Sequence, residues 1–332
     1  MKIQNKLLII ATTLFLAACG QIGDGSIGTI SDFFPFGENT TLVMENEQEP
    51  LANHEIFTTH ISGNRVQQHI SGLNIAHALV LELDDGTLRQ VFSFIDHPVF
   101  EDITDIQPNI NWVILQEPLV LGNYWSTGDG DAISTITGIG AQVVTPAGTF
   151  SETIQVTTQF PNGDHVVTYF AVGHGIVYDS WNTTFGETVS SATSELVQVR
   201  EGGMEIEIPV FFPAAGLETI EVEMMDITIY TNQDFPSLFT EVLQETVAEL
   251  ENVTVNNITV NRMEGFVSVD FSRNFLDINM GSALEGMLLH SLASTFGMFY
   301  RVENFHITLE GENYNSGHFY FGESDFIDVG SF

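Results

Sequence analysis

Histidine and acidic side chains are the residues of this chain that could hold a metal ion, and two short segments resemble metal motifs. His54-Glu55 begins like the helical His-Glu-x-x-His zinc motif, but the next histidine is His60 and the segment has the composition of a strand. Asp129-Gly130-Asp131 supplies the first two acids of a calcium loop, but Ile133 stands at the third ligand position. We therefore expect no metal ion and no other cofactor.

The acidic residues could also serve the hydrolysis of a glycosidic bond, which needs two carboxyl groups facing one sugar. Neighbouring pairs such as Asp84-Asp85 and Glu101-Asp102 occur, but 44 Asp and Glu make such pairs common by composition alone. His165 and His174 are placed to approach one another across a predicted hairpin. Because no Gly-x-Ser-x-Gly elbow and no phosphate-binding glycine loop occurs, we expect a non-catalytic protein. A cell-wall hydrolase stays an alternative, which two converging carboxylates or a Ser–His pair in a deep pocket would support.

Aromatic residues gather in the second half of the N-terminal region and form a candidate cleft: Trp112, Tyr124, Trp125, Tyr178 and Trp181. Such side chains could line a hydrophobic or sugar-binding surface, although core packing is their more common role. A related alternative function is a carrier. In that case the β domain would hold an acyl chain or another apolar ligand in a continuous cavity lined by Phe and Leu.

The single cysteine lies at the end of an N-terminal leader. Lys2 and Lys6 flank the start of an apolar run, 7–16, which is too short to cross a hydrocarbon core of about 30 Å and is typical of a signal peptide. The run ends in Leu16-Ala17-Ala18-Cys19, which resembles the lipobox of bacterial lipoproteins. The resemblance implies a lipidated Cys19 that holds the protein at the outer face of the cytoplasmic membrane. An ordinary cleaved signal peptide with an incidental cysteine is the alternative.

The charge of the chain is strongly acidic. Both lysines lie in the leader, so residues 19–332 carry six arginines against 44 acidic residues, a net charge of −38 with histidine neutral. Such a surface repels nucleic acid and anionic lipid headgroups, and we exclude nucleic acid as a partner. It suits cations, basic partner proteins, or an alkaline or saline medium. The sequence does not indicate an oligomeric state.

Residues 35–203 have the pattern of an almost wholly β domain, which follows a flexible Gly- and Ser-rich tether at 19–34. Turn signals at Asp84-Asp85-Gly86 and Pro161-Asn162-Gly163-Asp164 separate runs with strand composition. The predicted architecture is a mainly antiparallel sheet, curved or partly closed into a barrel. Part of this region resembles a domain of envelope lipoproteins of Firmicutes, on Leu115-x-x-Pro118-Leu119-x-x-Gly122-x-x-Trp125, on 144–150, and on Tyr169-x-Ala171-x-Gly173-x-Gly175-x-Val177. That resemblance implies no catalytic residue.

Residues 207–320 predict a compact α+β domain with the order strand, helix, strand, strand, helix, strand. The first helix begins near Asp234, with Pro236 in its first turn. The second helix begins with a capping box, Ser282-x-x-Glu285, and we expect it to end at Gly297. An acidic and partly disordered tail, 321–332, is expected to follow.

This second domain resembles the GerMN domain of sporulation and germination proteins and of other envelope lipoproteins. The resemblance rests on 265–271, Phe275-Leu276, the helix with Ser294-Thr295-Phe296, and the strand 302–311. Typical members carry Asn where this chain has Ser294, so no function is transferred from that position. The resemblance implies an extracytoplasmic binding or assembly module with a protein or cell-wall partner. We therefore expect a membrane-anchored envelope lipoprotein that acts through this domain, in sporulation, germination or cell-wall processes.

Overall fold

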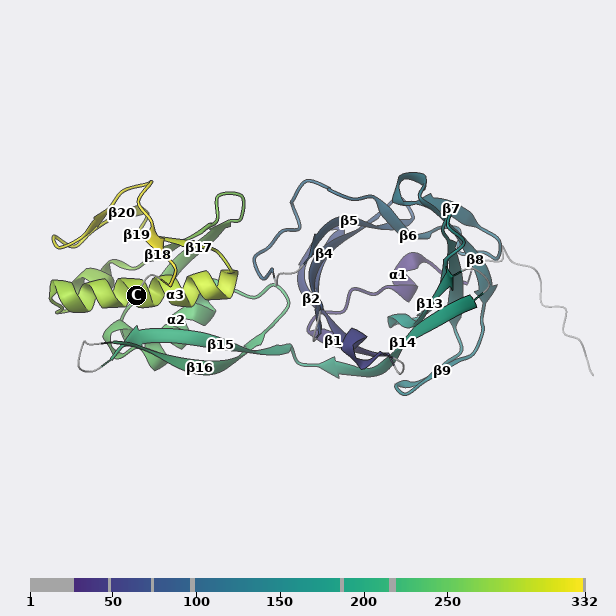
Figure 1. The fold of residues 1–332 in the computed structure, drawn as a ribbon, viewed down its shortest axis with the longest axis horizontal. Helices are drawn as coiled ribbons and strands as arrows, with labels where there is room; N and C mark the ends of the chain where they lie inside the picture. Colours follow the sequence, from purple (N-terminus) through teal and green to yellow (C-terminus); the bar gives the residue numbers. More distant parts are fainter. Residues whose placement is uncertain are drawn as a thin grey trace, which may run out of the picture.

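The computed structural model describes residues 27–46, 49–72, 75–95, 99–185, 188–214 and 219–330. Cys19 and the lipobox residues Leu16, Ala17 and Ala18 lie outside the described residues. Figure 1 shows a barrel and a smaller α+β domain side by side. No helix of the described segments has the length and apolar character needed to cross a bilayer.

The barrel is one antiparallel sheet that is nearly closed, as the β-rich pattern predicted. Its strands follow the order β6-β5-β4-β3-β2-β1-β14-β13-β12-β11-β8-β7. Their bounds are β1 (Thr40–Glu45), β2 (His54–Ser62), β3 (Arg65–Gly72), β4 (Ile75–Asp84), β5 (Thr87–Ile95), β6 (Trp112–Gln116), β7 (Tyr124–Thr127), β8 (Ala132–Ile139), β11 (Thr153–Gln159), β12 (His165–Ala171), β13 (Gly175–Phe185) and β14 (Thr188–Glu201). The hairpin of β9 (Val143–Thr145) and β10 (Gly148–Phe150) forms a separate small sheet.

Side chains close the seam between β6 and β7, where the sheet has its two free edges. The Trp125 indole donates to the carbonyl oxygen of Val113 at 3.2 Å, and the Thr127 hydroxyl donates to the same oxygen at 3.0 Å. The predicted turn at Asp85-Gly86 joins β4 to β5, with both residues at positive φ, 46° and 67°. This conformation suits a two-residue hairpin turn and explains the glycine.

A short helix, α1 (Ile30–Phe33), fills one end of the barrel (Figure 1). Its backbone is tied to the wall, since the Ile30 amide donates to Glu117 Oε1 at 2.8 Å and the Gly173 amide donates to the Asp32 carbonyl at 2.8 Å. Ile30 and Phe33 are fully buried in the barrel core. The expectation of a flexible tether to residue 34 is therefore wrong for 27–34, because its apolar side chains pack inside the sheet.

The second domain has three layers, with two helices between a hairpin and a sheet (Figure 1). The hairpin is β15 (Met204–Pro213) and β16 (Ile220–Ile229), and the helices are α2 (Phe235–Thr246) and α3 (Ser282–Tyr300). The sheet follows the order β17-β18-β19-β20-β21, and its strands are β17 (Val255–Asn261), β18 (Phe266–Phe271), β19 (Asn304–Leu309), β20 (Glu312–Asn315) and β21 (Tyr320–Phe321), with β22 (Ile327–Asp328) paired to β19. Strands β18 and β19 are parallel, as a helical crossover requires.

The second helix begins at Ser282 as predicted, but the predicted capping box and the predicted end are wrong. Gly281 is the N-cap of α3, and the side chain of Glu285 is buried rather than turned back to a capping position. The helix continues past Gly297 to Tyr300, and Arg301 ends it at φ 52°. Gly297 serves packing instead, since a Cβ there would lie 2.1 Å from a methyl carbon of Val329.

The expected disorder of the acidic end is also wrong for 321–330. Ile327 is buried and pairs with Phe305 of β19. Its apolar side chain, with that of Val329, provides the packing that the acidic composition of the segment conceals. Asp234, by contrast, caps α2 as predicted, with its carboxylate accepting from the Ser237 amide.

The segment between β5 and β6 makes two of the contacts that join the domains. Phe100, from the segment between β5 and β6, inserts into the core of the α+β domain and stacks on Phe299 at a centroid distance of 5.1 Å. The Arg262 guanidinium forms a two-pronged ion pair with Glu101, which follows Phe100. Gln67 of β3 holds the same segment to the barrel wall by accepting from the Ile103 amide at 2.9 Å. The two domains therefore share a packed interface on the β2–β3 side of the barrel.

Candidate ligand-binding site in the barrel lumen

Two cavities that meet inside the barrel form the candidate site. The plug cavity, about 260 Å³, lies beside residues 34–37, and the inner cavity, about 240 Å³, extends toward the opposite end of the barrel. They share Phe34, Ile56 and Gln68 as lining residues, so only the side chains at this position separate them. Together they fall in the range of about 300–1,000 Å³ that is usual for small-molecule sites.

The inner cavity is lined mainly by aliphatic and aromatic side chains that point inward from opposite walls. Strand alternation places most of them there, because residues two apart on a strand share a face, whereas Trp112, Val113 and Ile114 are consecutive residues at the β6 edge of the sheet. Its apolar lining consists of Phe34, Ile56, Ile70, Leu79, Leu81, Trp112, Val113, Ile114, Val156, Phe160, Val166, Phe170, Ile176 and Trp181.

Three aromatic rings form a row at the far end of the inner cavity. Trp112 opens β6, Phe160 follows β11, and Trp181 lies on β13. The ring centroids of Trp112 and Phe160 lie 6.1 Å apart, those of Phe160 and Trp181 lie 6.4 Å apart, and both pairs are stacked at 24°. Trp181 is 56% exposed, so this aromatic row lies at a mouth of the lumen.

Asp179 is the acidic group of the inner cavity. It lies opposite Thr168 in the register of β12 and β13. Burial in this apolar space raises the pKa of the Asp179 carboxyl to about 7, although a hydrogen bond with the Thr168 side chain opposes the rise. No Lys or Arg belongs to the lining residues. At neutral pH the carboxyl group can therefore be protonated, and it can then both donate and accept a hydrogen bond.

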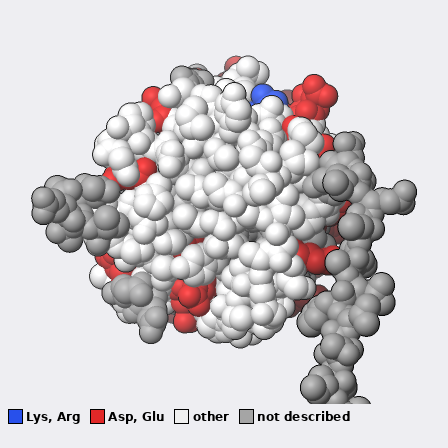
Figure 2. All heavy atoms as spheres, turned by 90° about the vertical axis from the view of Figure 1, so that its right-hand side faces the viewer, with Lys and Arg blue, Asp and Glu red and all other residues white. Residues whose placement is uncertain are grey.

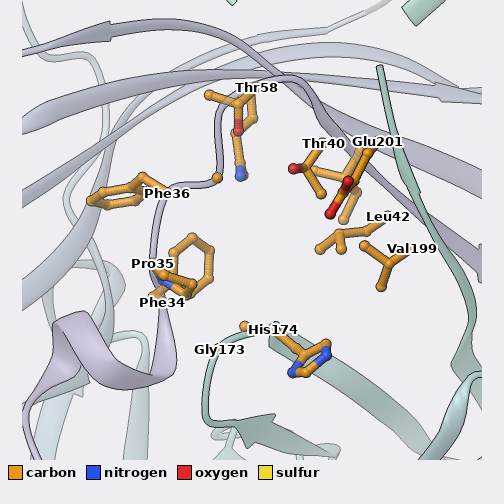
Figure 3. Close-up of a pocket in the computed structure, with 14 residues that line it drawn as sticks. Phe34, Pro35, Phe36, Thr40, Leu42, Thr58, Gly173, His174, Val199 and Glu201 are labelled. Atoms are coloured by element: carbon orange, nitrogen blue, oxygen red, sulfur yellow. The ribbon is translucent and has the colours of Figure 1, made fainter. Parts of the chain in front are cut away.

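The plug cavity is more polar at its rim. Figure 3 shows Phe34, Pro35 and Phe36 on one side and His174, Thr40 and Glu201 among the residues facing them. The Nδ1 of His174 donates to the carbonyl oxygen of Val172 at 2.8 Å when its proton is placed there. This contact fixes the ring at the edge of the cavity and leaves Nε2 as the nitrogen available to another group.

The structure brings together two of the five residues of the predicted aromatic cleft, Trp112 and Trp181. Trp125 is buried at the β6–β7 seam. Tyr124 is exposed on the outer wall. Tyr178 contacts Tyr169 edge to face at 5.7 Å and packs in the group that includes Val143 of the β9–β10 hairpin. The residues of the predicted cleft are thus divided among four places in the barrel.

Sequence reasoning missed Phe160 and Asp179 as lining residues. A signal for Asp179 was present, because it lies two residues before Trp181 on one strand and must share its face. The signal for Phe160 was its position directly before the Pro161-Asn162-Gly163 turn, which places its ring at the end of a hairpin.

The described residues offer little that resembles a hydrolase site. Ser268 Oγ lies 2.9 Å from His306 Nδ1, but His306 is buried and its Nε2 contacts the Gly322 carbonyl rather than a carboxylate. Asp84 and Asp85 belong to an exposed turn, and Glu101 is taken up by Arg262. The expected approach of His165 and His174 is wrong, because they lie at opposite ends of β12.

A second buried carboxylate lies in the α+β domain. Glu285 accepts from the Tyr314 hydroxyl at 2.8 Å and lies 2.7 Å from His318 Nδ1. Burial alone would raise the pKa of Glu285, but hydrogen bonds from Ser316, His318 and Tyr314 hold the pKa below its usual value. These contacts tie β20 and its turn to α3. No cluster of three or more His, Cys, Asp or Glu suited to a metal ion occurs in the parts of the chain that the structure covers.

Comparisons with known proteins give weak similarities only. No protein-family model matches the chain, the GerMN domain included, and no curated protein matches. A Bacteroides fragilis structure, provisionally described as an exported protein with a YmcC-like fold, is 10% identical and covers 50% of this chain and 97% of its own, with a TM-score of 0.31. A Parabacteroides distasonis structure, provisionally described as a lipoprotein, is 14% identical and covers 51% of this chain and 98% of its own, with a TM-score of 0.32. Similarity at this level does not establish a shared fold or function.

Proposed function

We propose that the protein is a lipid-anchored, extracytoplasmic carrier that holds an apolar ligand in its barrel. The barrel would bind the ligand between the inner cavity and the plug cavity. The aromatic row would form the entrance, and Asp179 would bind a polar group of the ligand. The ligand class that fits is a molecule with a flexible apolar body and a group able to hydrogen-bond to a carboxyl.

One observation carries this proposal: the lumen is lined by apolar side chains but is not filled by them. The core of a folded protein is normally close-packed, and unfilled apolar space costs stability. Side chains just fill a barrel of about eight strands, but the diameter grows with the number of strands, and this sheet has twelve. Here α1 fills one end only, and the remaining space is bordered by Thr, Gln and Ser at the places where an apolar core would carry larger residues. Burial of a ligand would recover about 25 cal/mol per Å² of apolar surface.

Attachment to the membrane is the second element of the proposal, and it rests on the leader and on Cys19. A carrier that works at a bilayer gains from a fixed position next to its source of ligand. Two or more acyl chains on Cys19 would give that lasting attachment. We also propose that the protein has no catalytic activity. Assembly through the GerMN-like domain, with a protein or cell-wall partner, stays a prediction from the sequence resemblance.

A matched pair of valines tests the carrier function. Val166 lines the inner cavity, whereas its neighbour Val167 lies on the outer face of the same strand. The probe is N-phenyl-1-naphthylamine, a neutral apolar fluorophore, added to the full-length lipoprotein in amphipol. Binding is measured as energy transfer from tryptophan, since Trp112 and Trp181 border the cavity.

We expect saturable binding that weakens at least tenfold in Val166→Phe, because the larger ring occupies the cavity, and that stays unchanged in Val167→Phe. Thermal unfolding of both variants controls for damage to the barrel. No saturable binding to the native protein, or equal binding by both variants, would overturn the carrier function.

A further inference from the structure

The outer wall of the barrel has one region without charge. The strands β7, β8, β11 and β12, which lie side by side, contain no Asp, Glu, Lys or Arg. We call their outward-facing surface the neutral wall. It lies opposite the β2–β3 side that carries the α+β domain, and Figure 2 shows it as a broad uncharged area with acidic residues around its edge.

The opposite end of the molecule is strongly acidic by comparison. The hairpin β15–β16 alone carries five acidic residues in its twenty positions. With 44 acidic residues in the chain, a wall of four strands without one is a marked local departure from the composition. The acidic surfaces of the protein repel anions. The neutral wall carries no acidic side chain on its strands that would add to this repulsion.

Three large apolar side chains are exposed beside one another on this wall. Leu121 precedes β7, Tyr124 opens it, and Ile133 lies on β8, with exposures of 67%, 71% and 45%. Tyr124 pairs with Thr135, so Ile133 is its diagonal neighbour on the same face. The 121–123 segment is held against β8, because the Gly122 amide donates to the Ile136 carbonyl at 2.8 Å. A tyrosine beside aliphatic side chains suits the boundary between water and lipid.

The lipid anchor would begin close to the 121–123 segment. The Ile27 amide donates to the Leu119 carbonyl, two residues before Leu121. Cys19 precedes Ile27 by eight residues, which span at most roughly 28 Å when fully extended. A lipid on Cys19 therefore has to enter the bilayer within that distance of Ile27. Bacterial membranes contain anionic lipids whose surface potential is negative, so the acidic faces of the protein would be repelled from them.

We propose that the neutral wall rests on the phospholipid headgroups of the membrane that holds the anchor. Leu121, Tyr124 and Ile133 enter the headgroup region, and the threonine and glutamine side chains around them bind headgroups through hydrogen bonds. The barrel then lies on its side, and the α+β domain projects away from the membrane. This inference rests on the proposed lipid anchor but not on the carrier function.

Spin labels test the orientation in the full lipidated protein. Because the one native cysteine carries the lipid, an introduced cysteine is the only free thiol. Ser126→Cys places a label on the neutral wall, and Met263→Cys places one in a fully exposed turn of the α+β domain. The protein is reconstituted in vesicles of phosphatidylethanolamine and phosphatidylglycerol at 3:1. We expect the label at 126 to be at least threefold less accessible to a water-soluble nickel relaxant than the label at 263.

A charge placed on the wall sharpens the test. Thr135→Glu should restore nickel access at position 126 in these anionic vesicles, but much less in phosphatidylcholine vesicles. Thr259→Glu, on exposed β17, should leave nickel access at position 126 unchanged in both kinds of vesicle. Equal access at 126 and 263 would overturn the inference. Dipolar coupling between labels at 126 that persists in amphipol, without a bilayer, would assign the wall to a second copy and would also overturn it.

Vesicle flotation separates this inference from the anchor. If Cys19→Ser floats with the vesicles as firmly as the native protein, the proposed anchor is wrong, and the inference fails with it. If only the native protein floats and the label at 126 is still fully accessible, the anchor holds and the membrane-facing wall alone is wrong.

Discussion

The α+β domain and the barrel use the same kinds of aromatic side chain for different purposes. In the α+β domain the rings pack directly against one another, as Phe239 and Phe296 do at a centroid distance of 4.6 Å. In the barrel, Trp112, Phe160 and Trp181 stack at longer centroid distances of 6.1 and 6.4 Å and also border the inner cavity. The first arrangement maximises dispersion contacts, whereas the second leaves part of each ring without a partner. The difference teaches that aromatic content by itself predicts neither a core nor a cleft.

The largest expected difference between the domains concerns aromatic truncation. Phe296→Ala should lower the free energy of unfolding by about 3–5 kcal/mol, because the ring is enclosed by other rings. Phe170→Ala should cost less, about 1.5–3 kcal/mol, since the Phe170 ring already borders the inner cavity. Urea unfolding measures both. Helical circular dichroism reports α2 and α3, and tryptophan fluorescence reports the barrel, which holds all three tryptophans. Equal losses of unfolding free energy in the two variants would show that the barrel core is as tightly packed as the core of the α+β domain.

Asp179 gives the lumen a pH dependence of its own. Its pKa is raised from 3.8 to about 7 by burial, so the folded protein binds a proton between these values that the unfolded chain does not. Stability should therefore fall as pH rises from about 4 to 7. Asp179→Asn should stabilise the barrel at pH 8, by at most about 4 kcal/mol, and should have little effect near pH 4. A stabilisation independent of pH would contradict a titrating Asp179.

The interface between the domains should respond to pH in the opposite sense. His69 is buried against Phe100 at a ring distance of 5.3 Å, and burial lowers its pKa from 6.5 to about 4. The unfolded chain therefore binds a proton between pH 6.5 and 4 that the folded protein does not. The stability present above pH 6.5 should decrease by about 3 kcal/mol as pH falls toward 4. His69→Gln should flatten this part of the profile, and an unchanged slope would place its origin elsewhere.

The sequence predicted the individual helices and strands better than the way in which they pair and pack. Strand composition and turn pairs indicated the antiparallel sheet, because each hairpin is local. Closure was harder to predict, since β1 pairs with β14 through contacts such as Thr40 with Glu201, far apart in the chain. The capping rules located Asp234 correctly but failed at Ser282 and Gly297. The structure caps α3 with Gly281 at its start and with Arg301 in the left-handed conformation at its end, and neither residue belongs to the predicted capping pattern.

The candidate site shows the same limit. Trp112 and Trp181 were identifiable by residue type, but whether an aromatic side chain points into the lumen depends on strand register. A shift by one residue moves it to the other face, as Tyr124 and Trp125 show. The composition of 20–34 suggested a flexible linker, and only the tertiary contacts of Ile30 and Phe33 show that its second half belongs inside the barrel.

The position of α1 constrains the order in which the chain can fold. Residues 27–34 are synthesised early, yet the groups that hold them, Glu117 and Gly173, follow about 90 and 140 residues later. Strand β1 likewise cannot complete its pairing until β14, its neighbour in the sheet, is present. This early segment therefore cannot pack in its final position until most of the barrel has been synthesised. Until then the apolar side chains of Ile30 and Phe33 lack the core residues that bury them.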